Sequence, residues 1–462
     1  MKPTIITAPR HPLPKSVFAA AAALLIVAPA TAGEGESSGS KGGGMTLPQA
    51  IIRALSFDPT IAQTFADVIQ ADGFAKSVRS DMRPHLSFEA SAGGAYRDRV
   101  LGGANVGNDL LFSRTTSLVG RQLLWSNGYF SNRYKDAQER TQAKLMLDRD
   151  QRESTALATV HHFLDVVRGR AQVALAKVNV EEHRKVLELA KSRAQAAGNQ
   201  ADVELASART KLAEALLRER ELDVLLSESH FQRYVGIKPP ALIPPKVPHF
   251  TSYANINLQN NWHYKAVEHQ HAAAMLEEKT MRAKYGPRVY LEGRGDVGNN
   301  VDGIQGRNNG ASLMVTASWS IFDGGQRKAD IQQANADVQR QQAILDETLT
   351  ILQHDSQSRW DDYRTRSEHI SILKKYHENL VKTIDLYRQQ FELGTRPLLS
   401  ILDIQSEATG AKIRIADEER DWADSGYHLL YFSGQLIPRT VGEGYTSTPR
   451  AVDGSATSKQ LP

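Results

Sequence analysis

Apolar residues follow two different periods along the chain. In SLMVTASWSIF, at 312–322, apolar residues alternate with mostly polar ones, which is typical of a half-buried strand. From Gln326 to Leu393 there is no proline, and apolar residues recur at intervals of seven. An interval of seven favours coiled-coil packing over the packing of an ordinary amphipathic helix. The positions with this spacing are Ile331, Val338, Leu345 and Leu352, and later Ile370, Ile384 and Phe391.

The first half of the chain carries the same order of patterns as the second half. Strand-like runs begin near Pro84 in the first half and near Pro287 in the second. A long helical stretch follows each, and a glycine-centred turn interrupts it once, at Gly198 and at Gly394. Matched positions lie about 200 residues apart, too far for an ordinary solenoid repeat. The chain therefore contains two copies of one unit fused in tandem.

These patterns predict the domain organisation. Each repeat is expected to contain a helix, a β-hairpin and a long antiparallel helical hairpin, so the fold is mainly α-helical with a smaller β portion. A helix of about 68 residues would reach roughly 100 Å. A proline-rich stretch, which cannot be helix interior, separates the repeats. We predict the first repeat at 46–236, with its β-hairpin at 85–125 and its helical hairpin at 129–236; the connector at 237–258; and the second repeat at 259–437, with its β-hairpin at 287–322 and its helical hairpin at 326–437.

The strands constrain how the chain assembles. Strands of about ten residues have the length that crosses a membrane at a tilt. Four strands cannot close, because the smallest membrane barrels have about eight, and open edges are not tolerated in lipid. Three chains would supply twelve strands and twelve long helices. The alternative interpretation is a soluble hairpin packed on the helices.

The two ends of the chain differ from the rest. Residues 1–32 have a basic lead, an apolar run and the small residues Ala30-Thr31-Ala32, as a cleaved secretion signal does. The alternative is a membrane anchor, but the run is shorter than the ~20 residues that a spanning helix needs. Residues 33–45 and 438–462 are rich in small and polar residues and are predicted to be disordered.

Composition argues against several functions. The formal net charge is +4, and removal of Lys2, Arg10 and Lys15 with the signal leaves about +1, so no nucleic-acid partner is expected. There is no cysteine, which excludes disulfides and thiolate metal sites and is compatible with the periplasm. No catalytic motif is present, so we expect neither an enzyme nor a cofactor. His161 and His162 are adjacent on a helix and are expected to point apart, so no metal site is predicted.

Four motifs carry a resemblance to a known family. They are TLPQAIIRALSFDPTI (46–61), RPHLSF (83–88), WSIFDGGQRKADIQQA (319–334) and FELGTRPLLSILDIQSEA (391–408). In this order they resemble the TolC family of outer-membrane efflux and secretion channels. The resemblance implies a homotrimer with a 12-stranded outer-membrane β-barrel and a 12-helix periplasmic tunnel. It also implies a periplasmic adaptor (a membrane fusion protein) and an inner-membrane ABC transporter or proton-driven pump as partners.

The resemblance also suggests which residues form the periplasmic entrance. The GTR motif places Arg396 at the family's gating arginine, and Asp202 stands at the position of its acidic partner. Asp403 matches the second of two constriction aspartates, whereas Ser400 replaces the first, and Phe391 replaces a gating tyrosine. The resemblance therefore predicts an Arg396–Asp202 ion pair and a ring of Asp403 carboxylates. The hairpin turns at Gly198 and Gly394 would contact the adaptor.

Three functions remain open at this stage. The stretch GDVGNNVDGIQGRNNGASLMV (295–315) is similar to the type I secretion branch that exports large adhesins. The leading prediction is therefore the exit duct for secreted protein, in contact with outer-membrane lipid. The outer-membrane component of a drug or metal efflux pump is the first alternative. A periplasmic coiled-coil scaffold is the alternative from another class.

Overall fold

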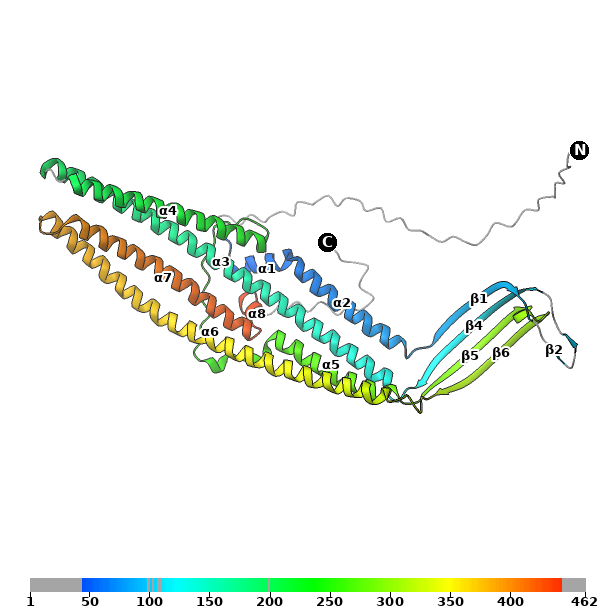
Figure 1. Ribbon diagram of the computed structural model, residues 1–462. Helices are drawn as coiled ribbons and strands as arrows, with labels where there is room; N and C mark the ends of the chain where they lie inside the picture. The colour runs from blue at the N-terminus through cyan, green and yellow to red at the C-terminus, as the bar shows by residue number, and fades with distance from the viewer. Residues whose placement is uncertain (1–43, 98–99, 102–103, 106–109, 198–199, 443–462) are drawn as a thin grey trace, which may run out of the picture. The chain divides into compact units, whose positions relative to one another are not determined.

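The computed structural model describes residues 44–97, 100–101, 104–105, 110–197 and 200–442. All of them belong to the compact unit that begins at Gly44. The predicted signal, Gly198 and most of the two predicted disordered segments lie outside the described residues. Within this unit the fold is mainly helical with one four-stranded antiparallel sheet, which confirms the predicted fold class at that level (Figure 1).

The sheet is assembled from one β-hairpin of each repeat. Strands β1 (His85–Ala95) and β4 (Leu111–Trp125) pair with each other, as do β5 (Arg288–Asn299) and β6 (Arg307–Ser318). Strand β4 also pairs with β5, so the order is β1-β4-β5-β6 and β1 and β6 form the two edges. A two-residue hairpin, β2 (Val100–Leu101) and β3 (Ala104–Asn105), lies between β1 and β4 in the chain.

The register gives the sheet one apolar and one polar face. Phe88 stands opposite Leu118, Leu291 opposite Val315, and Gly293 opposite Leu313, all on one face. Large side chains of this face are exposed, including Leu86 at 73%, Phe88 at 70% and Leu313 at 74%. The other face carries charge pairs: Arg121 Nε lies 3.0 Å from Glu292 Oε1, and Arg294 Nε lies 2.8 Å from Asp296 Oδ1.

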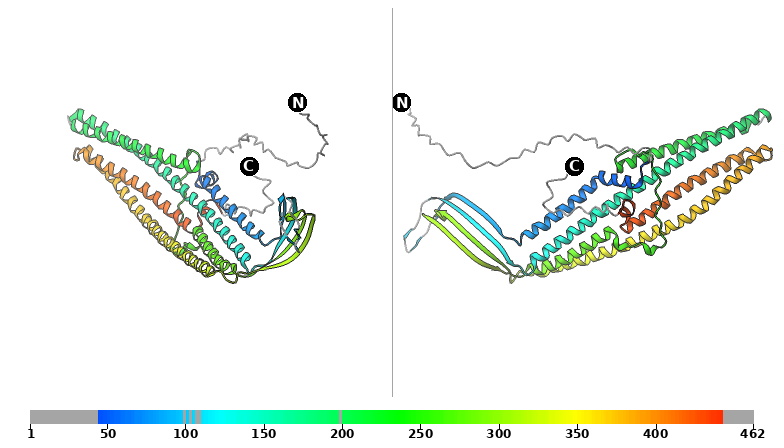
Figure 2. Two further views of the ribbon diagram at one scale, coloured as in Figure 1. Left: turned by 45° about the vertical axis from the view of Figure 1, so that its right-hand side comes forward. Right: turned by 180° about the vertical axis from the view of Figure 1, so that it is seen from behind.

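Each strand pair runs into a long helix and then into a helical hairpin. Helix α3 (Tyr129–Ala197) follows β4 and is 69 residues long, which corresponds to roughly 100 Å. It is followed by α4 (Gln200–Val235). In the second repeat α6 (Gln326–Glu392) is followed by α7 (Leu398–Phe432). The strands therefore adjoin one end of α3 and α6, and the helical turns lie at the other end (Figure 2).

Shorter helices pack against the long ones. Helix α5 (Trp262–Lys284) packs between α3 and α6, and α2 (Pro59–Ser80) packs on α3. Helix α3 also contacts α4 and α7, so it packs against helices of both repeats. The largest apolar core forms where α1 (Leu47–Phe57), α3, α4, α7 and α8 (Leu436–Thr440) meet. Its fully buried side chains include Ile51, Phe163, Phe231 and Leu436.

The structure differs from the sequence-based expectations in two places. The first helix breaks at Asp58, whose side chain accepts a hydrogen bond from Thr60 N and caps α2, with Pro59 in its first turn. Strand β6 ends at Ser318 rather than at residue 322.

Among the helices that the structure describes, none combines the length and the apolar character needed to cross a lipid bilayer.

Candidate functional site

The α6–α7 turn has a fixed geometry that depends on one glycine. Gly394 has φ +80°, a left-handed conformation that glycine adopts without steric cost. Its N–H donates to Phe391 O at 2.9 Å, and Thr395 N–H donates to Gln390 O at 3.0 Å. These two bonds form a Schellman motif, which satisfies carbonyls at the end of α6. The predicted turn at Gly394 is therefore an ordered cap, and its contact with an adaptor stays a prediction.

Beneath the two turns, an apolar cluster packs the ends of the helical hairpins together. We call it the tip cluster. Phe391, at the predicted gating position, is 3% exposed and lies inside this cluster. Its aromatic ring thus serves packing between the repeats. The buried members of the tip cluster are Val186, Ala190, Ala206, Phe391, Leu398, Ile401 and Leu402.

Arginines link the first helical hairpin to the second around the tip cluster. Arg388 Nη2 lies 2.6 Å from Glu182 Oε2. Arg193 lies over the Phe391 ring, with its Cζ 4.5 Å from the centroid, and donates to Phe391 O at 3.3 Å. Burial alone would raise the pKa of Glu182, but hydrogen bonds from Lys185 and Arg388 outweigh it and hold that pKa below its ordinary value.

Asp403 forms another of these links. It lies on α7, and its Oδ1 accepts a hydrogen bond from Arg209 Nη2 of α4 at 3.0 Å. The carboxylate that the resemblance assigned to the constriction is thus paired with a cation of its own chain. Ser400 is half-buried on the first turn of α7, and its N–H donates to Pro397 O.

The predicted gating arginine lies in the α6–α7 turn and is held against the end of α6. Arg396 Nε donates to Gln390 Oε1 at 2.7 Å. Its Cζ lies 3.7 Å from the centroid of the Tyr387 ring, a cation–π contact. Asp202 lies in the first turn of α4, where the helix dipole favours a carboxylate. The Arg396–Asp202 pair stays a prediction.

Sequence reasoning missed several residues of this site. Tyr387 was not among the predicted site residues, although it precedes Phe391 by one helical turn and so shares its face. Arg193, Arg209 and Gln390 gave no signal, because a polar residue on a long helix usually faces solvent. Their partners lie on other helices or across a turn.

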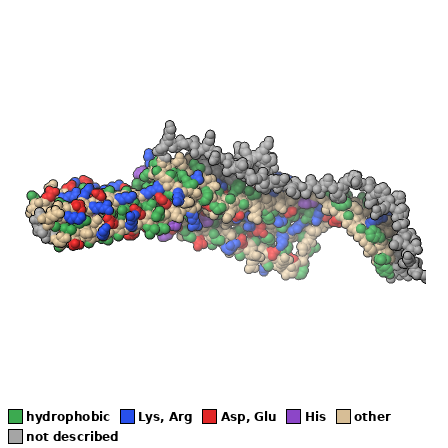
Figure 3. Space-filling model, turned by 90° about the horizontal axis from the view of Figure 1, so that it is seen from above, with side chains coloured by type: hydrophobic (Ala, Val, Ile, Leu, Met, Phe, Trp, Pro, Cys, Tyr) green, Lys and Arg blue, Asp and Glu red, His purple; other side chains and the backbone are tan. Residues whose placement is uncertain are grey.

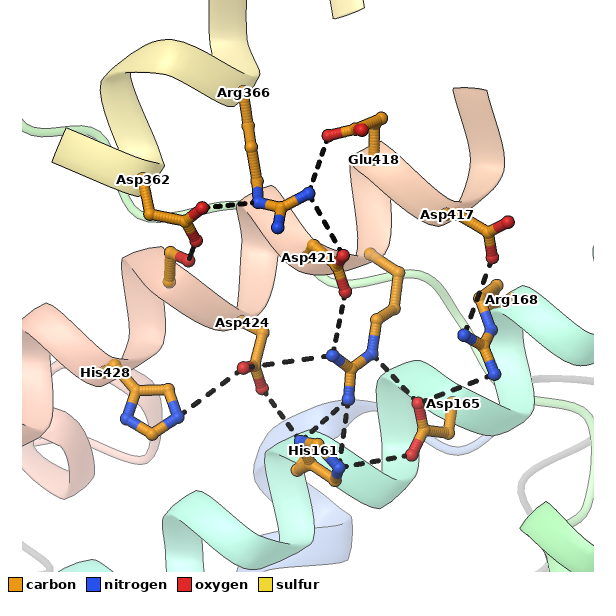
Figure 4. A network of polar contacts seen from close by, with 12 residues as sticks. His161, Asp165, Arg168, Asp362, Arg366, Asp417, Glu418, Asp421, Asp424 and His428 are labelled. Carbon is orange, nitrogen blue, oxygen red and sulfur yellow. Dashed lines mark hydrogen bonds and ion pairs between the residues drawn. The ribbon is translucent and has the colours of Figure 1, made fainter. Parts of the chain in front are cut away.

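A second polar cluster joins α3, α6 and α7 (Figure 4). Arg420 is 11% exposed and donates to Asp165 Oδ1 at 2.9 Å and to Asp421 Oδ1 at 3.0 Å. From α6, Arg366 reaches Glu418 at 2.7 Å and Asp421 at 3.1 Å. Because these charges are paired across three helices, they fix how α7 lies against both neighbours.

Histidines on α3 belong to the same cluster. His161, His162 and Asp165 place three possible metal-ligand atoms within 4.8 Å of one another. The expectation that His161 and His162 point apart is therefore wrong, because both rings lie near the Asp165 carboxylate, at 3.5 and 3.9 Å. The guanidinium of Arg420 lies 2.7 Å from His161 Nδ1 and already supplies positive charge there. Burial and the neighbouring His161 lower the pKa of His162 to about 4.

Charged side chains of both signs also cover the outer surface of the helices. On the face shown in Figure 3, basic and acidic groups are interspersed along the helical hairpins. Many are ion pairs within one helix turn, such as Lys191–Glu188 and Arg218–Glu221. Exposed pairs of this kind contribute only about 0–1 kcal/mol each, so they keep the surface hydrated rather than hold the fold together.

One family model matches part of the chain. Residues 254–434 match the model of a family described as "Outer membrane efflux protein". This segment runs from the end of the connector through β5, β6 and α6 to α7. No match to the sequence was found among curated proteins.

Solved structures with the same fold cover most of the chain. The outer membrane protein VceC from Vibrio cholerae has a TM-score of 0.73 and 16% identity, over 86% of this chain and 96% of that one. The CmeC outer membrane channel from Campylobacter jejuni has a TM-score of 0.72 and 14% identity, over 84% and 86%. The open state of the MtrE outer membrane channel from Neisseria gonorrhoeae has a TM-score of 0.69 and 15% identity, over 86% and 90%.

The second half of the chain therefore resembles the outer membrane efflux protein family, and the whole described unit has the fold of solved outer-membrane channels. The type I secretion branch is not distinguished by these matches and stays a prediction.

Proposed function

We propose that three copies of this chain form the exit duct of a tripartite export machine. The observation that carries the proposal is the sheet, whose apolar side chains are exposed and whose strand order is open. Edges β1 and β6 present backbone groups that lipid cannot satisfy. Pairing of β6 with β1 of a neighbouring chain would close twelve strands into a barrel, with the apolar face toward outer-membrane lipid.

The polar face of the sheet supports a water-filled interior. Arg121–Glu292 and Arg294–Asp296 lie on the face opposite to Phe88 and Leu313. In membrane barrels, lipid-facing and lumen-facing residues alternate along each strand. The charged face would therefore line the path of the cargo.

The helices below the sheet would form the periplasmic tunnel. Three chains would contribute twelve helical segments around one axis, with the turns at Gly394 at the far end. A periplasmic adaptor would bind there and connect the tunnel to an inner-membrane ABC transporter or proton-driven pump. The family match and the length of α3 support this arrangement.

We assign the periplasmic gate to the end of the helical hairpins that carries the tip cluster and the α6–α7 turn. In this proposal Arg396 pairs with Asp202 of a neighbouring helical hairpin, and three symmetric pairs bias the entrance toward the closed state. Asp403 would line the constriction. Because Ser400 carries no charge and Arg209 already binds Asp403, the constriction would attract cations only weakly.

Two kinds of cargo fit the duct. The description of the matching family favours the efflux alternative, in which the cargo would be a drug or a metal. The 295–315 stretch favours secreted protein through its resemblance to the type I secretion branch. Deletion of the chain separates the two. A strain that lacks it would accumulate drugs or metal ions if the duct serves efflux, and would fail to secrete protein if the duct serves secretion.

Single-channel conductance in planar bilayers tests the gate. We predict that Arg396→Ser raises the resting conductance of the reconstituted protein, because the closed entrance loses its pairs. Arg340→Ser is the matched control, since Arg340 pairs with Asp337 within α6 and far from the turn. Equal conductance of Arg396→Ser and wild type would overturn the gate assignment. A wild-type protein that never conducts would overturn the proposal that the chains form a duct.

A further inference from the structure

We propose that Tyr387 and Gln390 position Arg396 for the gate, so that Tyr387 takes the aromatic role that Phe391 does not fill. The inference rests on the proposed gate function. It assigns a role to Tyr387, which lies one helical turn before the 391–408 motif and on the same face of α6 as Phe391.

Two contacts fix the guanidinium. The Tyr387 ring lies beneath Arg396 Cζ at 3.7 Å, and Gln390 Oε1 accepts from Arg396 Nε at 2.7 Å. The ring gives attraction without a preferred hydrogen-bond direction, whereas the amide oxygen sets the orientation of the guanidinium plane. Together they define both the position and the rotation of the charged group.

The backbone on either side of Arg396 is also fixed. Gly394 and Thr395 form the Schellman motif, and the Thr395 hydroxyl donates a further bond to Gln390 O at 2.9 Å. On the other side, Pro397 has φ −72° and caps α7. The reversal of the chain therefore returns the Arg396 side chain over the last turns of α6.

Phe391 is engaged elsewhere. Its ring is buried in the tip cluster and contacts Arg193 of α3, whose guanidinium also donates to Phe391 O. Tyr387 is only half-buried and packs against the edge of the same cluster. The two aromatic residues thus bind two different arginines: Phe391 joins the two hairpins, and Tyr387 holds the gating arginine.

This arrangement has a consequence for the gate. A guanidinium has five N–H donors, and Gln390 uses the one on Nε. The terminal nitrogens can then bind a carboxylate of a neighbouring chain in a bidentate geometry. A positioned arginine loses less conformational freedom on pairing, so the closed state is favoured.

Conductance of Tyr387 variants tests the inference. Tyr387→Leu should raise the open-to-closed ratio by about two- to fivefold per chain, as expected for loss of an exposed cation–π contact. Tyr387→Phe should conduct like wild type, because the contact needs the ring and not the hydroxyl. The double variant Tyr387→Leu/Arg396→Ser should conduct no more than Arg396→Ser alone, because both changes act on the same interaction of Arg396 at the gate.

The outcomes separate this inference from the proposed gate. If Arg396→Ser raises conductance and Tyr387→Leu does not, the positioning role is wrong and the gate stands. If Arg396→Ser has no effect, the gate itself is wrong. Should Tyr387→Leu fail to assemble, Gln390→Ala at an exposed position replaces it. A smaller rise is expected there, and wild-type conductance in Gln390→Ala would overturn the positioning role.

Discussion

Glu153 on α3 is a buried carboxylate that anchors the end of the helical core. It is 3% exposed, and its carboxylate accepts hydrogen bonds from the backbone N–H groups of Leu436 and Ile437, at 3.0 and 3.2 Å. These bonds fix the start of α8 on α3. Burial raises the pKa of Glu153 to about 7, and the two N–H donors offset only part of that rise.

This environment predicts a pH dependence of stability. The pKa of Glu153 is above its ordinary value of 4.5, so the folded state holds the proton more tightly than the unfolded state. The resulting stabilisation is complete below pH 4.5 and is lost as the pH rises through 7. It amounts to about 3 kcal/mol per chain. We predict that Glu153→Gln flattens the dependence of the thermal midpoint between pH 5.5 and 8.

The measurement is thermal unfolding of detergent-solubilised protein at several pH values. Glu188→Gln is the control, since Glu188 is an exposed partner of Lys191. A pH slope that is the same in Glu153→Gln as in wild type would contradict the assignment.

Single residues were the least predictable level. On sequence alone Glu153 is one of many carboxylates on a long helix, and a solvated helix face is the usual explanation for such a residue. Its burial depends on α8, which lies 283 positions further along the chain. The Arg396 position followed from a motif, but its contact with Tyr387 depends on the reversal of the chain at Gly394. Motif matching cannot place such contacts.

At the scale of elements, the α6–α7 turn depends on the left-handed conformation of Gly394. A Cβ at this position would meet only Arg193 Nη2, at an ordinary 3.7 Å, so a substitution is opposed by the backbone and not by crowding. We predict that Gly394→Ala lowers the stability of the turn by about 1–2 kcal/mol. Gly410→Ala is the matched variant: Gly410 lies inside α7 with open space around it, and the change should stabilise by about 1 kcal/mol.

Hydrogen exchange and thermal unfolding of both variants check this pair. The amides of Gly394 and Thr395 should lose protection in Gly394→Ala and keep it in Gly410→Ala. Unchanged protection in Gly394→Ala would mean that the turn tolerates the new residue and that the Schellman motif is not needed there.

Elements were the most predictable level, because their periods are local. The interval of seven indicated α6, long stretches without proline indicated both α3 and α6, and alternation indicated the strands. The break at Asp58 was missed although Asp-Pro is a typical helix start, because the apolar pattern continues through it. The end of β6 at Ser318 was also missed. Trp319 and Ile321 continue the alternation, but the chain there has already left the sheet.

At the scale of the whole molecule, the central claim is assembly. The sheet order and its exposed apolar face follow from one chain, whereas the number of chains was inferred from the number of strands that closes a barrel. No pattern within one sequence encodes that number directly. The polar cluster around Arg420 keeps α3, α6 and α7 together within each chain, so a whole protomer would be the unit that assembles.

The mass of the detergent-extracted protein, measured by light scattering with low-resolution electron microscopy of the same sample, tests this claim most directly. We predict three chains of 51.0 kDa each, less any signal that is cleaved, in a long tapered tube with detergent bound at the end that carries the strands. A monomer or dimer that remains in solution without detergent would contradict the account. The exposed face of the sheet would then be covered by protein and not by lipid.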